Sequence, residues 1–298
     1  MSDAARAIFR FAFLPTVLGV SAAAWIWREA LVAHFALKVD FGTVALLLTL
    51  LAVFVAEQVF PAVPAWNYRL LSGKPDGIRR LGRDLFYVFI VTQLSALAIT
   101  LVDRELTSRL AALGLALDRP RLWPSAAPFA ARVALAFFVL ELGSYGYHRA
   151  AHRVPLLWRF HSTHHVVAEL TGAAALRTHP LDNVLFFLAR TIPLVVLGAG
   201  AEEVSTAGYL CGVLGILAHA NVEVSPRLGG LLLNVPAIHA LHHAAEVQLG
   251  ACNYGCHTVL WDRVFGTFRP APKTPPTLGL SPPGPRSLWQ ELVAPPRP

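Results

Sequence analysis

The sequence predicts an all-α, polytopic membrane protein with about four to six transmembrane or re-entrant helices and a helical, histidine-rich metal site on the cytoplasmic side. Three observations lead to this prediction. Of the 298 residues, 55% are hydrophobic and only 14% are charged, against roughly a quarter charged in an ordinary soluble domain. The hydrophobic residues gather in long runs with few charges. Histidines cluster in the second half of the chain.

Four runs match the roughly 20 residues that cross a ~30 Å hydrocarbon core as a helix. They cover residues 11–27, 41–60, 84–103 and 127–147. Two softer runs cover residues 183–201 and 204–222, and we expect them to form a helical hairpin. The last 29 residues contain ten prolines, which predicts a disordered tail over 269–298.

The charge distribution predicts how the spans are oriented. The formal net charge is +7, and the segment 61–83 carries five basic residues against one acid, Asp76. By the positive-inside rule this segment is cytoplasmic, and counting the crossings places every histidine cluster on that face. Because the basic residues flank apolar runs, they fit membrane orientation rather than nucleic-acid binding. Three cysteines, an odd number, argue against a disulfide framework.

Eleven of the twelve histidines follow residue 147. Three clusters stand out: His148 with His152, then His161 with His164 and His165, then His239 with His242 and His243. On a helix, positions i, i+3 and i+4 share one face, so each cluster should present its imidazoles to a common point. Eight convergent imidazoles are too many for one metal ion and suit two. Imidazole binds iron, copper, nickel and zinc, so ligand type alone leaves the metal open.

Other catalytic motifs find no support. A zinc protease of the H-E-x-x-H type needs a glutamate base between its two histidines, whereas Arg-Ala-Ala separates His148 from His152. The glycine-rich signatures of acyl and nucleotide chemistry do not occur at a strand-to-helix transition.

Several motifs resemble the fatty acid hydroxylase superfamily, also called the sterol desaturase family. They are ELGSYGYHRAAH (141–152), LWRFHSTHH (157–165), RTHP (177–180), HAN (219–221), NVPAIHALHH (234–243), NYG (253–255) and WDRVFGT (261–267). The resemblance covers residues 134–268, which we take as the catalytic domain, and leaves 1–133 as an N-terminal transmembrane region.

The resemblance implies an all-histidine site for two metal ions, normally iron, that uses O2 to hydroxylate or desaturate an unactivated C–H bond of a lipid or sterol-like substrate. The implied ligands are the eight clustered histidines together with His179 and His219. The apolar substrate would come from the bilayer, and electrons from a separate reductase or electron carrier. Glu141 stands where the family often has Asp and is expected to accept a hydrogen bond from a ligand histidine. Glu223 stands where some members carry a further histidine, and is either a ligand or the acidic end of a helix.

Alternatives stay open at this point. A carotenoid or other isoprenoid substrate fits the same chemistry. From another class, a non-catalytic membrane metal-binding or transport protein would use the same imidazoles, although a transporter should carry ligands along its spans. Cys252, Cys256 and His257 could form a separate metal site, but the resemblance already accounts for the NYG motif between the two cysteines.

Overall fold

The computed structural model describes residues 3–68, 75–112, 122–225, 231–280 and 287–293. Within these residues the chain forms helices joined by turns and loops, and its β structure is limited to three isolated bridges. The predicted all-α class is confirmed.

Among the described residues, five helical stretches are long and apolar enough to cross a membrane. They are α1 (Asp3–Ile26), α3 (Phe41–Val59), the stretch Asp76–Val102, α6 (Phe129–Ala151) and α8 (Pro180–Leu197). The third stretch lies within a continuous helical run of α4 (Pro75–Phe86), a π-helical turn (Tyr87–Val91) and α5 (Thr92–Ala112), and this run continues past the predicted end at residue 103. The short helix α2 (Arg28–Phe35) follows α1. These stretches match five of the six predicted runs and confirm a multi-pass membrane protein.

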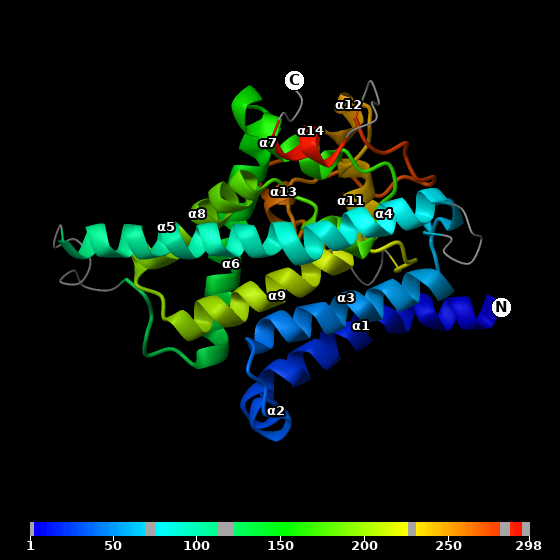
Figure 1. The fold of residues 1–298 in the computed structure, drawn as a ribbon. Coiled ribbons are helices and arrows are strands. Elements are labelled where there is room, and N and C mark those ends of the chain that lie inside the picture. Colours follow the sequence, from blue (N-terminus) through cyan, green and yellow to red (C-terminus); the bar gives the residue numbers. More distant parts are fainter. Residues whose placement is uncertain (1–2, 69–74, 113–121, 226–230, 281–286, 294–298) are drawn as a thin grey trace.

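The sixth predicted run corresponds to α9 (Ala201–His219), which packs against α3 and α6 and is largely buried within the protein. Glu202 and Glu203 occupy its first turn. The preceding helix α8 ends at Gly198, whose φ of 81° is the left-handed C-cap conformation that glycine adopts without strain. The chain then returns through α9, so the hairpin brings the C-terminal end of α9 back toward the end of the bundle where α8 begins (Figure 1).

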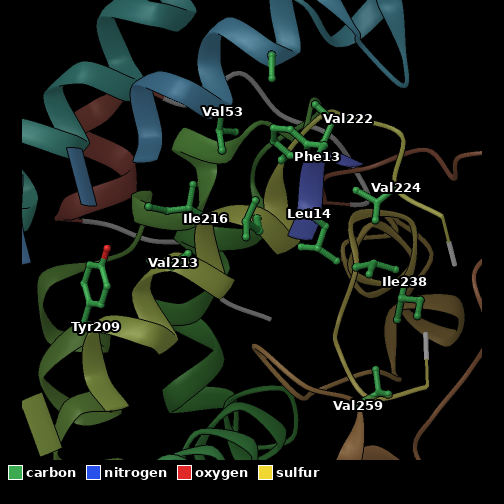
Figure 2. Packing of buried hydrophobic residues seen from close by; sticks show 14 of the residues in the cluster. Phe13, Leu14, Val53, Tyr209, Val213, Ile216, Val222, Val224, Ile238 and Val259 are labelled. Atoms are coloured by element: carbon green, nitrogen blue, oxygen red, sulfur yellow. The ribbon is translucent and has the colours of Figure 1, made fainter. Parts of the chain in front are cut away.

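One apolar core ties the spans to the segments that follow them (Figure 2). Phe13 of α1, Val53 of α3 and Ile216 of α9 belong to a single cluster of buried residues. The same cluster includes Ile238 and Val259, which lie beyond the last span. Burying an aliphatic or aromatic side chain of this kind contributes about 1.5–3 kcal/mol. The core therefore holds the C-terminal segments against the bundle.

The crossing of α6 and α8 positions one side of the histidine cluster. A Cβ atom at Gly143 would lie 2.5 Å from the Ala189 carbonyl oxygen and 2.7 Å from the Arg190 Cα, so only glycine permits this approach. The last turn of α6, which carries His148, therefore lies beside the first turn of α8, which carries Asp182.

Short helices gather at one end of the bundle (Figure 1). They are α7 (Pro155–His165), η4 (Gly172–Leu176), α11 (Pro236–His242), α12 (Val247–Gly250) and α13 (Leu260–Val264). Both α7 and α11 begin with proline. Proline is suited to this position because the N–H that it lacks has no hydrogen-bond partner within the helix there. Arg80 and Arg83 of α4 bond to residues at this same end. Arg69 and Lys74 of the basic segment lie outside the described residues.

The predicted disordered tail needs correction. Within its described part, Leu278 is buried against Val167 and Leu170, and α14 (Leu288–Leu292) buries Glu291 completely. Proline prevents long helices and sheet ladders, but a proline-rich segment still docks where single side chains find partners. Figure 1 shows α14 lying beside α7.

Candidate metal centre

Nine histidines converge into two adjoining groups at the end of the bundle. The first group contains His148, His152, His161, His165 and His242. The second group contains His164, His219, His239 and His243. Within each group, one ring nitrogen of every histidine lies within 4.8 Å of those of the others. The structure therefore brings together nine of the ten predicted ligands.

Two helices contribute to both groups, which explains why the groups adjoin. On α7, His161 and His165 are one turn apart and belong to the first group, while His164 belongs to the second. The histidines of α11 and of its C-cap divide in the same way. Across the boundary, the rings of His165 and His243 stack with centroids 4.4 Å apart.

The Nε2 atoms point toward one another inside each group. Nε2–Nε2 distances are 2.9 Å for His148–His242, 3.1 Å for His152–His165, 3.1 Å for His164–His219 and 2.9 Å for His219–His239. Since a histidine nitrogen binds a transition metal at about 2.0–2.1 Å, nitrogens this close suit ligands of a shared ion.

Five Nδ1 atoms turn outward to oxygen acceptors. They are those of His148 to the Tyr254 carbonyl (2.7 Å), His242 to the Cys252 carbonyl (2.8 Å), His219 to the Gly215 carbonyl (2.8 Å), His164 to the Arg177 carbonyl (3.3 Å) and His161 to Asp182 Oδ2 (3.0 Å). An Nδ1–H that donates to oxygen leaves the Nε2 lone pair free, which is the tautomer that binds a metal ion.

Asp182 is a carboxylate acceptor that the sequence analysis missed. Its Oδ2 accepts from His161, and its Oδ1 accepts from the Tyr147 hydroxyl at 2.6 Å. Asp182 is 3% exposed, so the hydroxyl bond also pays part of the cost of burying the charge. The residue stands alone in an apolar run after His179, and no local pattern marks it.

A tight turn presents the carbonyl that accepts from His148. Asp262 accepts from the backbone N–H groups of Tyr254 and Gly255 at 2.8 and 2.7 Å. A Cβ atom at Gly255 would lie 2.0 Å from the Thr258 carbonyl oxygen, so the turn requires glycine. The two motifs thus act together, because NYG supplies the Tyr254 carbonyl and WDRVFGT supplies Asp262, which fixes the turn that presents it.

Glu141 does not have its predicted role. Its carboxylate accepts from His257 Nδ1, from the Thr258 N–H at 2.8 Å and from the Thr258 hydroxyl at 2.7 Å. It lies two helical turns, about 10 Å, before the histidine of α6. Glu141 therefore supports the turn that follows NYG rather than a clustered histidine. Cys252 and Cys256 belong to neither histidine group.

Two further candidates lie outside both groups. His179 caps α8: its Nδ1 accepts from the Leu181 N–H at 3.1 Å, and its Nε2 donates to the Leu292 carbonyl at 2.9 Å. Both ring nitrogens are therefore occupied by backbone partners. Glu223 forms an ion pair with Arg10 at 3.0 Å, and both side chains are partly exposed. Glu223 therefore behaves as a surface acid rather than a ligand.

The environment of the groups favours neutral imidazoles. Eight of the nine histidines are buried and His152 is partly so. Burial lowers the pKa of His164 and His165 well below the usual value, and that of His242 to about 3. His161 Nε2 and His243 Nδ1 are buried without a hydrogen-bond partner. An unpaired buried polar group costs about 1–3 kcal/mol, and a metal bond at His161 would remove that cost. These residues fit a pair of metal ions.

Comparison with known proteins agrees with this geometry. Residues 133–267 match the fatty acid hydroxylase family, and this range includes all nine clustered histidines. This part of the chain belongs to the fatty acid hydroxylase superfamily. The resemblance noted in the sequence motifs is thereby confirmed.

The relatives of this chain include a lipid hydroxylase, a monooxygenase and an aldehyde decarbonylase. An ornithine lipid hydroxylase of Rhizobium tropici is 35% identical over 151 residues, 51% of this chain and 46% of the relative. The human alkylglycerol monooxygenase is 30% identical over 230 residues, 72% of this chain and 46% of the relative. A very-long-chain aldehyde decarbonylase of Oryza sativa is 31% identical over 140 residues, 43% and 21% of the two chains. The chain thus spans about half the length, or less, of these relatives. No solved structure matches it.

Proposed function

We propose that this protein is an integral-membrane diiron oxygenase that uses O2 and external electrons to hydroxylate or desaturate an unactivated C–H bond of a lipid. The convergence of nine histidines, eight of them buried, into two adjoining groups carries the proposal. We assign one iron ion to each group and leave His179 out of the ligand set. When bound, the two ions would supply the means to reduce O2 and to oxidise carbon.

The chain's own residues perform three tasks in this proposal. The inward Nε2 atoms hold the ions, and the outward Nδ1 bonds fix the ring orientations. The neutral imidazoles add no charge to the centre. Burial of the two groups keeps water away from a reactive oxidant, which limits wasteful side reactions.

The placement of the ligands weighs against metal transport. A transporter needs ionisable ligands along its spans to form a path. The nine histidines lie on α7, on α11 and its C-cap, and at the C-terminal ends of α6 and α9. This is one end of the bundle, which suits a centre at the membrane surface.

We propose a bilayer lipid as substrate and the cytoplasmic side for the metal centre. The names of the relatives point to amphipathic lipids, and such a molecule reaches the centre directly from the membrane. Arg79, Arg80 and Arg83 lie on α4 at the same end as the histidines, and the positive-inside rule assigns such an end to the cytoplasm. A separate cytoplasmic electron carrier then has access to the centre.

Lipid analysis of host cells tests the proposal. Membranes would be compared from cells that express the wild-type chain, His164→Ala or His34→Ala, the last an exposed histidine of α2 that serves as control. We expect a lipid that gains one oxygen atom or loses two hydrogen atoms in wild-type and His34→Ala cells. Isotopically labelled O2 should label the hydroxylated product. The same product in His164→Ala cells would contradict the assignment.

A further inference from the structure

The short helix α14 is held in place by one buried carboxylate. Glu291 is 0% exposed. Its Oε1 accepts from Arg177 Nη2 at 2.7 Å and from Arg83 Nη1 at 3.1 Å, and its Oε2 accepts from the Tyr87 hydroxyl at 2.9 Å. A helix of five residues is too short to be stable alone. These contacts, rather than helix propensity, therefore hold α14 against the protein.

The charges around Glu291 balance one another. Arg177 is 5% exposed and also lies 3.9 Å from Asp84, measured from Nη1 to Oδ1. Two arginines, Arg83 and Arg177, thus face two carboxylates. Without the Glu291 carboxylate, this enclosed site keeps an excess positive charge, and a buried charge that loses its partner is strongly unfavourable.

Two of these connections lead to the same ligand histidine. The Arg177 carbonyl accepts from His164 Nδ1 at 3.3 Å. Thr163, the residue before His164 on α7, donates its hydroxyl to the Glu291 carbonyl at 2.9 Å. His164 belongs to the second group, where its Nε2 lies 3.1 Å from His219 Nε2. Glu291 therefore contacts both α7, which carries the His164 ring, and Arg177, whose carbonyl accepts the hydrogen bond from that ring.

We propose that Glu291 is a positioning residue for the second histidine group, and that α14 acts as a latch that keeps the His164 ring in place for the second metal ion. The inference rests on the proposed function, because it assumes that the second group binds a metal ion. Glu291 lies outside the range 133–267 that matches the family.

Metal titration of the full chain in detergent tests the latch. Metal-free protein would be titrated with Co²⁺, whose visible absorption reports the ligand geometry, and with Fe²⁺ under argon. We expect wild-type protein to bind two equivalents, one for each group. Glu291→Gln keeps the side-chain shape but loses the charge. It should bind the first equivalent normally and the second about tenfold or more weakly, the effect typical of lost support behind a ligand.

Two variants frame this comparison. Thr163→Val removes only the hydroxyl that bonds the Glu291 carbonyl, and should weaken the second equivalent in the same direction but less. Trp289 lies on the same helix, and 69% of it is exposed. The Trp289→Ala variant serves as the control and should bind both equivalents as the wild-type protein does.

The outcomes separate the latch from the metal centre itself. If Glu291→Gln binds both equivalents normally, or weakens both equally, the latch is overturned. If Glu291→Gln does not fold, Thr163→Val decides, and an unchanged second equivalent in that variant overturns the latch. Wild-type protein that binds fewer than two equivalents contradicts the proposed function instead.

Discussion

Replacing Asp182 by asparagine tests whether the first histidine group depends on that carboxylate. In the structure the two carboxylate oxygens accept from His161 Nδ1 at 3.0 Å and from the Tyr147 hydroxyl at 2.6 Å. Asparagine has nearly the same volume but only one acceptor oxygen. Its amide nitrogen would face one of the two donors, so either His161 or Tyr147 loses its bond.

The size of the effect follows from these contacts. A hydrogen bond to a charged group contributes about 1.5–3 kcal/mol. At about 1.4 kcal/mol for each factor of ten, its loss weakens metal binding at the first group roughly 10- to 100-fold. Tyr147→Phe leaves the acceptor of His161 intact, so we expect a clearly smaller loss of affinity in that variant.

Competition with a chelator measures this difference directly. Metal-loaded wild type, Asp182→Asn and Tyr147→Phe would be titrated with chelator while the metal that stays bound is counted. The expected order of affinity is wild type, then Tyr147→Phe, then Asp182→Asn. An unchanged affinity in Asp182→Asn would refute the proposed support of His161, as would equal losses in the two variants.

Three further predictions follow from individual contacts. Gly143→Ala should lower the melting temperature, since overpacking costs about 1–3 kcal/mol, whereas Gly146→Ala, where a Cβ meets nothing within 4 Å, should not. Metal-free protein should melt at a lower temperature at about pH 5 than at about pH 7.5. Burial lowers the pKa of His242 from 6.5 to about 3, so between these pH values protons bind preferentially to the unfolded chain. The free energy of unfolding therefore decreases as the pH is lowered. Equal melting temperatures at the two pH values would contradict this prediction. Metal analysis should find two ions in His179→Asn, because asparagine keeps a capping side chain. It should find fewer than two in His219→Ala. A loss of metal in His179→Asn would return His179 to the ligand set.

The histidine clusters could be predicted because their spacing is local. Positions i, i+3 and i+4 share a helix face whatever the fold, so His161, His164 and His165 were expected to act together. Their division between two groups could not be predicted in this way. It depends on contacts between helices far apart in the sequence, such as the one that places His164 of α7 against His219 of α9.

The supporting residues were harder to predict for the same reason. Asp182 and Glu291 meet their partners only in the folded chain, and nothing in their neighbourhoods marks them. Glu141 was expected beside a ligand because it stands where the resembling family often has Asp, but it lies two helical turns before His148 and bonds to His257 and Thr258 instead. The proline-rich composition of the tail gave no sign of α14 or of the buried Glu291 side chain that fixes it.

The central claim is that the two histidine groups hold a pair of metal ions. Iron content and Mössbauer spectra of protein purified gently, without chelators, test it most directly. We predict two irons per chain, one for each group, with the magnetic coupling of a pair. A single uncoupled iron, or no bound metal, would contradict the claim.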